Sequence, residues 1–270
     1  MKAGLCTIAL REKLLEDVLN VATDIGFDGV EIWGREPHIS ETFDEGRVRA
    51  ARRMVRSRGM EVSMFGSYLR FGAAPPPDGQ QNVTAEDALQ TAQTLGTGLC
   101  RVWAGEMGSR QADRAYWKRV VDEMRAASEM AANLDLILAV EMHDNTLADT
   151  GKSTLRLIQD VGAPNVKANY QATFQKGGDD PYTRLRTVLP HVVSVHAQNY
   201  AEMAGNPGHK MRRVPLEDGV VEYRRIAKLL FDGGFDGYIS IEFPPMGIRS
   251  KMRALSRDHR FLRSVVESLR

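Results

Sequence analysis

Short apolar runs alternate with longer amphipathic segments along the whole chain. The runs are rich in β-branched and aromatic residues, as buried strands are, and the longer segments repeat apolar positions at helical spacing. Strands are expected at residues 3–10, 30–33, 60–65, 99–103, 136–141, 165–171, 191–198 and 238–243. Helices are expected at about residues 12–25, 43–58, 84–95, 111–133, 153–161, 181–189, 220–231 and 249–269.

About eight consecutive strand–helix units favour a closed (β/α)8 TIM barrel over a doubly wound sheet. The length of 270 residues is close to the roughly 250 residues of a typical barrel, so one domain spanning residues 1–270 is expected. No glycine fingerprint of the GxGxxG or GxxxxGK[ST] kind follows a predicted strand. The nucleotide-binding alternatives therefore lose their main support.

Two of the predicted strands end in a glutamate. The apolar run 136–140 stops at Glu141, and the strand 238–243 brings Glu242 to its far end. A carboxylate at the end of so apolar a strand is costly to desolvate unless a cation or several donors compensate it. Taken alone, Glu141 can also mark the point where its strand emerges into water, but a second such strand indicates one shared site.

In a TIM barrel the active site lies at the carboxyl ends of the strands. The residues that close the predicted strands there are Glu31, Trp33, Trp103, Glu141, His143, Gln171, His196, Gln198 and Glu242. Two glutamates, a histidine and an amide oxygen make a mixed oxygen and nitrogen set that suits Mn²⁺ or Mg²⁺ and can accept Co²⁺ or Zn²⁺.

Several of these residues have a second interpretation. His196, within an apolar strand, can be a core histidine whose hydrogen bonds are satisfied. His143 is expected to point to the same side as Glu141, towards a ligand, or else to lie exposed in a loop. Arg213, with Lys210 and His209, can bind a phosphate or carboxylate, although a solvated loop is the favoured interpretation of this basic cluster.

Five segments together resemble the xylose isomerase-like sugar phosphate isomerase/epimerase superfamily of TIM barrels. They read GFDGVEIWG, VEMHDNTLADT, VKANYQ, SVHAQN and GYISIEF, and the resemblance covers essentially the whole chain. The superfamily includes ketose 3-epimerases, hydroxypyruvate isomerase, inosose dehydratase and the type IV apurinic endonucleases.

This resemblance implies one divalent metal, with Mn²⁺ expected first, held by Glu141, Gln171, His196 and Glu242. It implies that Glu141 and Glu242 also move the substrate proton, in a sugar isomerase or epimerase that works through an enediolate. We expect Glu31, Trp103, His143 and Arg213 to contact the substrate. The alternatives are a dehydratase of the inosose dehydratase type and a sugar-binding protein without catalysis.

The chain departs from the family pattern at three places. Gln171 stands where the family has an aspartate ligand, Phe174 where a histidine is frequent, and residues 197–199 read Ala-Gln-Asn instead of x-Lys-Asp. An apurinic endonuclease is disfavoured, because the histidines that its zinc site needs after strands three and four are missing.

Composition narrows the expected partners and compartment. A formal net charge of +1 gives no reason to expect nucleic acid or a membrane surface, so a small carbohydrate is the expected partner. Cys6 and Cys100 lie inside apolar runs and are expected to be buried free thiols in a reducing compartment. The apolar stretch near the N-terminus is too short for a signal peptide, so we expect a cytoplasmic protein, and a homodimer is compatible with the sequence.

Overall fold

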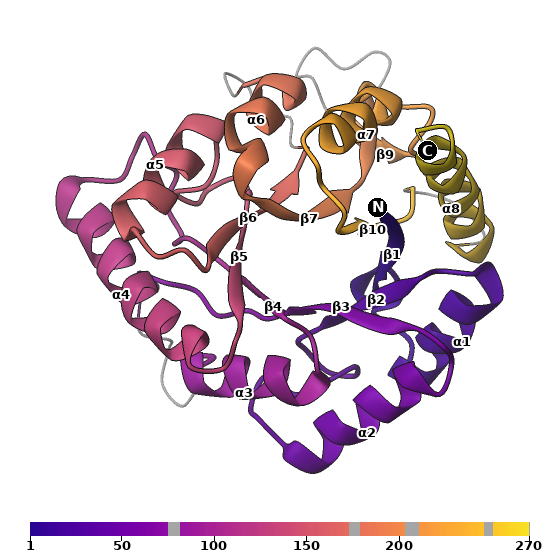
Figure 1. Ribbon diagram of the computed structural model, residues 1–270, viewed down its shortest axis with the longest axis horizontal. Coiled ribbons are helices and arrows are strands. Elements are labelled where there is room, and N and C mark those ends of the chain that lie inside the picture. The colour runs from indigo at the N-terminus through magenta and orange to yellow at the C-terminus, as the bar shows by residue number, and fades with distance from the viewer. Residues whose placement is uncertain (75–81, 173–178, 203–210, 246–250, 270) are drawn as a thin grey trace.

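The computed structural model describes residues 1–74, 82–172, 179–202, 211–245 and 251–269. Eight parallel strands close into a barrel in the order β1-β10-β7-β6-β5-β4-β3-β2, and the helices of the described residues surround it (Figure 1). The predicted (β/α)8 architecture is confirmed.

The barrel strands are β1 (Lys2–Cys6), β2 (Gly29–Trp33), β3 (Glu61–Gly66), β4 (Leu99–Val102), β5 (Ile137–Glu141), β6 (Val166–Gln171), β7 (Val192–Ala197) and β10 (Tyr238–Ile241). The helices are α1 (Leu15–Ile25), α2 (Glu45–Arg56), α3 (Ala85–Leu95), α4 (Arg114–Ala132), α5 (Gly151–Val161), α6 (Pro181–Val188), α7 (Tyr223–Asp232) and α8 (Lys251–Glu267). Two short 3₁₀ helices, η1 (Thr7–Leu10) and η2 (Leu189–His191), and a hairpin of β8 (Asn199–Glu202) and β9 (Met211–Val214) complete the described elements.

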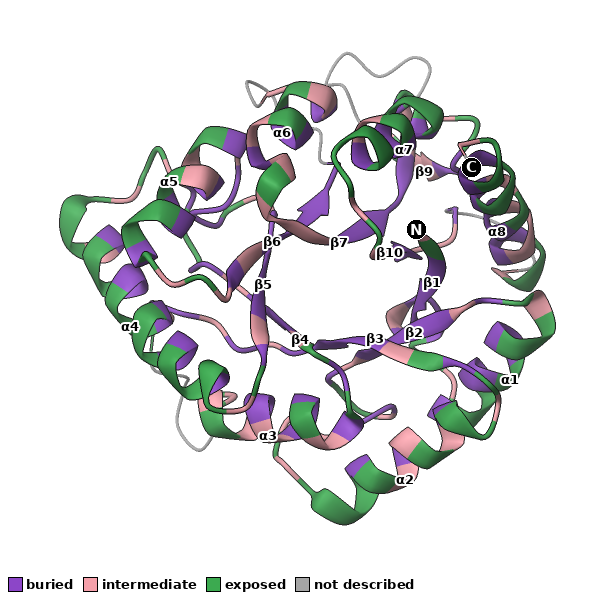
Figure 2. Cartoon of the chain, viewed as in Figure 1, coloured by how far each residue is buried: buried purple, intermediate pink, exposed green. Residues whose placement is uncertain are grey.

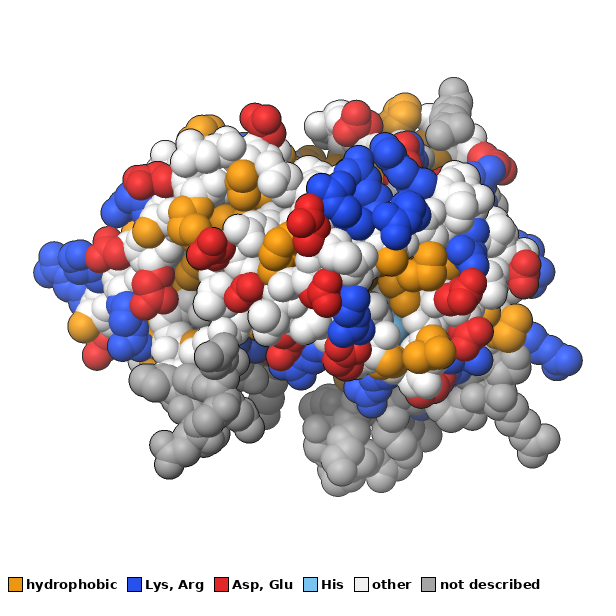
Figure 3. Space-filling model, turned by 90° about the horizontal axis from the view of Figure 1, so that it is seen from below, with side chains coloured by type: hydrophobic (Ala, Val, Ile, Leu, Met, Phe, Trp, Pro, Cys, Tyr) orange, Lys and Arg blue, Asp and Glu red, His pale blue; other side chains and the backbone are white. Residues whose placement is uncertain are grey.

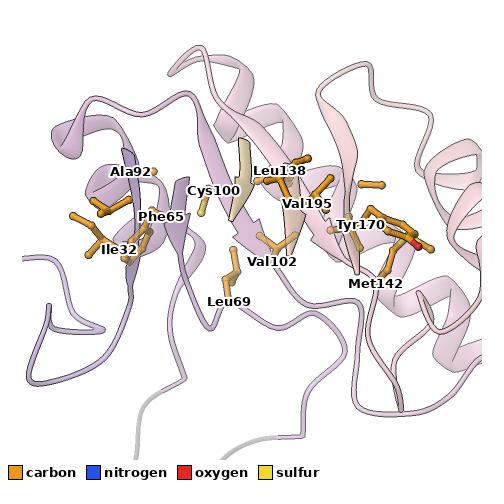
Figure 4. Packing of buried hydrophobic residues seen from close by; sticks show 14 of the residues in the cluster. Ile32, Phe65, Leu69, Ala92, Cys100, Val102, Leu138, Met142, Tyr170 and Val195 are labelled. Atoms are coloured by element: carbon orange, nitrogen blue, oxygen red, sulfur yellow. The ribbon is translucent and has the colours of Figure 1, made fainter. Parts of the chain in front are cut away.

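Alternate residues along each barrel strand serve two different layers, because successive side chains of a strand point to opposite faces. Leu138 and Val140 of β5 belong to the hydrophobic core between strands and helices, and Val195 of β7 does too. Figure 4 shows Leu138 and Val195 within this core, and Figure 2 shows that the buried faces of the helices turn towards the strands. The neighbouring residues on the opposite face of each strand, such as Glu141 after Val140 and His196 after Val195, point into the barrel interior.

Local signals in the sequence set the element boundaries. Thr84 is the predicted cap of α3, and its side chain accepts a hydrogen bond from the backbone N–H of Asp87. Gly26 ends α1 in the left-handed conformation, with φ of 94°, and its N–H reaches the carbonyls of Ala22 and Thr23. The next strand, β2, therefore starts close behind the helix.

Two details differ from the predicted elements. Residues 7–10 were expected to continue the first strand but form η1, and β1 ends at Cys6. The Thr7 side chain accepts a hydrogen bond from the Trp33 N–H at 2.8 Å, which turns the chain over the end of β2. The antiparallel pair of β8 and β9 was not expected, because its two strands are short and mostly polar.

The outer face shows no sign of a membrane-spanning element. Across the stretches of chain that the structure describes, no helix combines the length and the apolarity that a bilayer crossing requires. Helix α2 carries five arginines, and Figure 3 shows Lys and Arg side chains gathered on the side of the molecule where α2 lies. Arg47 and Arg49 pair with Glu36 and Glu45, as solvated surface charges do.

Candidate active site

A cavity of about 320 Å³ opens among the carboxyl ends of the barrel strands. Its lining comes from β4, β5 and β6, from the residues that follow β5, β7 and β10, and from the hairpin. The lining residues are Ile8, Tyr68, Arg101, Trp103, Glu141, His143, Asp144, Gln171, Gln198, Tyr200, Met211, Arg213, Glu242 and Phe243. The cavity is large enough for a small molecule and combines aromatic rings with charged groups of both signs.

Three of the predicted metal ligands meet at the floor of this cavity. His196 Nδ1 lies 3.6 Å from Glu141 Oε1 and 3.8 Å from Glu242 Oε1. One atom from each of the three residues falls within 4.8 Å of the others. These separations are longer than hydrogen bonds, and they leave the three atoms facing a common point.

The amide of Gln171 completes the group. Its Nε2 donates a hydrogen bond to Glu242 Oε2 at 3.2 Å, which fixes the orientation of the amide. Its Oε1 is buried and has no hydrogen-bond partner within the described residues. Two carboxylates, an imidazole and an unpaired carbonyl oxygen suit a divalent cation such as Mn²⁺ or Mg²⁺, so the residues present fit the implied metal.

A buried arginine contacts one of the two glutamates. Arg101 Nη1 lies 3.3 Å from Glu141 Oε2 and 3.7 Å from Glu31 Oε1, and the arginine side chain is 3% exposed. Its other donors reach the backbone carbonyls of Ser67 and Gly66. Burial alone would raise the pKa of Glu141, but the charge of Arg101 and the contact with His196 lower that pKa to about 2. Glu141 is therefore held as an anion.

The other glutamate has the opposite character. Burial raises the pKa of Glu242, His196 partly offsets the rise, and the charge of Glu141 adds to it, so that the pKa reaches about 7. Glu242 Oε2 accepts a hydrogen bond from Gln198 Nε2 at 2.9 Å besides the one from Gln171. Of the two carboxyl groups, Glu242 is the one that can gain and lose a proton near neutral pH.

His143 lies at the side of the cavity. Its Nδ1 lies 2.8 Å from the carbonyl oxygen of Asp144. A carbonyl can only accept, so Nδ1 donates in this hydrogen bond and Nε2 is the ring nitrogen that the bond leaves free. The ring packs against Trp103 with centroids 4.8 Å apart, and Trp103 in turn stacks on Tyr68 at 6.2 Å.

The structure places the predicted substrate-contacting residues in two groups. Trp103, His143 and Arg213 line the cavity, and the Arg213 guanidinium lies 3.9 Å from the centre of the Phe243 ring. Glu31 is not among the lining residues; it is 2% exposed and lies against His196. Substrate contact by these four residues stays a prediction. Phe174, His209 and Lys210 lie outside the described residues.

Sequence reasoning missed Arg101 and Tyr68. Arg101 is a charged residue inside the buried strand β4, two positions before Trp103 and hence on the same face. The alternation of strand faces therefore indicates that Arg101 points to the same side as Trp103, and this pattern could have identified Arg101 from the sequence. Tyr68 follows β3 in a loop whose sequence indicates no partner, and only the fold brings its ring next to Trp103.

Comparison with known proteins agrees with this geometry. Residues 19–265 match the family model described as the xylose isomerase-like TIM barrel. The chain belongs to this family. The superfamily predicted from the sequence is therefore confirmed.

Proteins named for different activities resemble the chain over most of its length. It is 26% identical over 260 residues to a 3-dehydroshikimate dehydratase of Bacillus anthracis, covering 90% of this chain and 91% of the relative. It is 20% identical over 268 residues to a fructoselysine 3-epimerase of Escherichia coli O157:H7, covering 91% of each. A solved xylose isomerase-like protein from Mycobacterium smegmatis, in complex with magnesium, shares the fold with a TM-score of 0.78, 16% identity and coverage of 99% and 97%.

Proposed function

We propose that the protein is a metal-dependent lyase that removes water from a small hydroxylated ketone carrying a carboxylate. The observation that carries this proposal is the buried contact between Arg101 and Glu141. Epimerisation by two glutamates requires both to exchange protons with the substrate, whereas Arg101 lowers the pKa of Glu141 to about 2 and so makes its carboxylate a weak base. Dehydration needs one base and one acid. The contact therefore favours the dehydratase, the alternative from the sequence, over the isomerase or epimerase.

The groups that dehydration requires are present in the cavity. A divalent cation bound by Glu141, Gln171, His196 and Glu242 would supply Lewis-acid polarisation of the substrate carbonyl. His143 Nε2 accepts a proton from the carbon next to that carbonyl. The electron pair of the broken C–H bond forms a carbon–carbon double bond as the neighbouring hydroxyl leaves. Glu242, whose Oε2 accepts hydrogen bonds from Gln171 and Gln198, is the carboxyl group that we assign to protonating the departing hydroxyl, which leaves as water.

The charge and shape of the cavity support an anionic substrate. Arg213 lines it, and a guanidinium binds a carboxylate through paired hydrogen bonds. Arg101 also lines it, but its guanidinium already pairs with Glu141 and Glu31. Tyr68, Trp103 and Phe243 add flat apolar surfaces that suit the face of a ring. The likeness to a 3-dehydroshikimate dehydratase is consistent with such a substrate.

The test is turnover of 3-dehydroshikimate by the protein loaded with Mg²⁺ or Mn²⁺, run beside fructoselysine and simple ketoses in deuterated water. A product lighter by one water, detected by mass spectrometry, is expected from the first substrate. A ketose that keeps its formula and gains deuterium at the carbon next to the carbonyl would establish the epimerase instead. Metal and ligand binding without any turnover would favour a sugar-binding protein.

Replacing His143 with asparagine is expected to lower kcat about 100-fold, because a positioned base contributes at least that much to proton transfer. Metal affinity should stay unchanged, since His143 is not among the grouped ligand atoms. The matched control is His191→Asn, at the start of β7 and away from the cavity. Equal rates for His143→Asn and the native protein would remove His143 from the mechanism.

Replacing Gln171 with aspartate is expected to tighten divalent metal binding about tenfold, because a carboxylate adds charge to the ligand set. Isothermal titration with Mn²⁺ measures the change. Gln198→Glu is the control, because it adds the same negative charge at a neighbouring side chain. The Gln198 oxygen already accepts a hydrogen bond from Arg213 Nε at 3.1 Å, so it is not free to bind the metal. The comparison separates direct metal ligation from the general attraction of a negative charge. Equal tightening in both variants, or none in Gln171→Asp, would mean that Gln171 is not a ligand.

A further inference from the structure

We propose that Glu31 is a positioning residue that holds the His196 imidazole by Nε2, so that Nδ1 is the atom presented to the metal. The inference rests on the metal dependence included in the proposed function. It gives Glu31 a task different from the substrate contact that the sequence analysis expects.

The contact itself joins two strands across the barrel. Glu31 lies on β2 and His196 on β7, 165 positions apart, and neither strand pairs with the other in the sheet. His196 Nε2 and Glu31 Oε2 are 2.7 Å apart, a short and charge-assisted hydrogen bond. The imidazole is fully buried, and Asn169 Nδ2 also lies 3.1 Å from Nε2 and 3.3 Å from Nδ1, so Glu31 and Asn169 together hold the ring.

The other ring nitrogen faces the predicted metal ligands. Nδ1 lies 3.6 Å and 3.8 Å from the nearest oxygens of Glu141 and Glu242, beyond ordinary hydrogen-bond length. A histidine that ligates a metal usually donates its second ring N–H to a carboxylate or carbonyl, which fixes its tautomer and orientation. Glu31 is the carboxylate in that position.

Glu31 is itself held on both sides. The Cys6 thiol donates a hydrogen bond to Oε2 at 3.1 Å, and Oε1 lies 3.7 Å from Arg101 Nη1. A Cβ added at Gly66 would lie 2.6 Å from Glu31 Oε1, so the carboxylate occupies the space that a side chain on β3 would fill. These contacts leave the Glu31 carboxylate no room to turn towards the cavity.

Cys6, Glu31 and His196 also group closely enough to be considered as a metal site of their own. The geometry does not favour it. The thiol and Nε2 both donate to the same carboxylate oxygen, at 3.1 and 2.7 Å, so protons already occupy the space between the three atoms. A metal there would need the thiol and Nε2 deprotonated and this oxygen released from both bonds.

The experiment combines metal titration with nitrogen NMR of the histidine rings in the Zn²⁺-loaded protein, without substrate. In the native protein we expect one Zn²⁺ per chain, with His196 protonated at Nε2 and bound through Nδ1. Glu31→Ala should weaken Zn²⁺ binding about 10- to 100-fold and remove the Nε2–H signature. Glu31→Gln keeps an acceptor oxygen and should recover most of the affinity.

Gly66→Ala provides an independent variant, because it pushes the Glu31 carboxylate aside without removing its charge. It is expected to weaken Zn²⁺ binding, as Glu31→Ala does. If Glu31→Ala does not fold, Gly66→Ala is the variant that tests the role of Glu31. Binding through Nε2, two Zn²⁺ per chain, or native affinity in both Glu31→Ala and Gly66→Ala would overturn the inference. A native protein that binds one Zn²⁺ through Nδ1 but never dehydrates a substrate would overturn the proposed function alone.

Discussion

Glutamine in place of Glu242 is expected to lower turnover about 10⁴-fold while making the metal-free protein more stable at pH 8. Turnover falls because the variant loses a metal ligand and the group that protonates the leaving hydroxyl. The stability gain follows from the raised pKa. The folded protein holds this proton up to a pKa of about 7, whereas the unfolded chain releases it near the ordinary glutamate pKa of 4.5.

The sign of the stability effect is fixed by linkage. Between pH 4.5 and 7 the folded state binds more protons at Glu242 than the unfolded state does, so this residue makes stability fall as pH rises. Above pH 7 the full cost of ionising the buried Glu242, on the order of 3 kcal/mol, is present. Glu242→Gln removes that cost, and urea unfolding of the metal-free proteins at pH 5 and pH 8 measures the difference.

A carboxylate away from the cavity gives the control for Glu242→Gln. Glu61 pairs with Lys2 on the surface, and its pKa is lowered by the hydrogen bonds from Lys2 and Tyr238. Glu61→Gln should leave turnover intact and should not stabilise the protein at pH 8. If Glu242→Gln is active, or if its stability gain is equal at both pH values, the role given to Glu242 is wrong.

Methionine in place of Arg101 is expected to lower the free energy of unfolding of the metal-free protein by about 3–5 kcal/mol at pH 7. The substitution leaves Glu141 and Glu31 as buried carboxylates without their cation, and it removes the hydrogen bonds from Arg101 to the carbonyls of Gly66 and Ser67. Removing one partner of a buried ion pair leaves the other charge buried without compensation, and this costs more stability than replacing both partners does.

The loss caused by Arg101→Met should shrink as the pH falls. In the native protein the Glu141 pKa of about 2 is below the ordinary glutamate pKa of 4.5, so its contribution to stability is present above pH 4.5 and is lost as pH falls towards 2. Without Arg101, burial raises that pKa, and protonation in acid relieves the variant. Chemical unfolding at pH 7 and pH 5 measures both losses.

The double variant Arg101→Met/Glu141→Gln tests the origin of this loss. Removing the stranded carboxylate should restore part of the stability at pH 7, because the buried charge is gone. The hydrogen bonds to the two carbonyls are not restored, so recovery should be incomplete. A loss that is the same at both pH values and in the double variant would show that packing alone accounts for the effect of Arg101.

The barrel, and the meeting of the candidate ligands at one rim of it, were predictable because both depend on local pattern. Apolar runs and helical spacing determine the strand–helix units, and the carboxyl ends of parallel strands share one rim of the barrel. Gln171, His196 and Glu242 follow from that rule once their strands are placed, and the structure brings Glu141, His196 and Glu242 within 4.8 Å of one another.

The remaining features depend on contacts that no local pattern specifies. The sequence near Arg101 does not indicate that its partner is Glu141, and that contact changes the preferred chemistry. Glu31 was placed among the substrate contacts because it closes a strand, but its hydrogen bond to His196 arises only when β2 and β7 face each other in the closed barrel. The hairpin of β8 and β9 is short and polar, so its sequence resembles that of a loop.

The distribution of the ligands along the chain also orders the events of biosynthesis. Glu141, Gln171 and His196 leave the ribosome well before Glu242, which follows the last barrel strand and lies at position 242 of 270. A nascent chain therefore lacks the complete ligand set until its final strand has been made and the ring of strands can close. A ligand that binds only the folded state stabilises that state alone. A bound metal would therefore stabilise the closed barrel and would not stabilise a chain whose last strand is still missing.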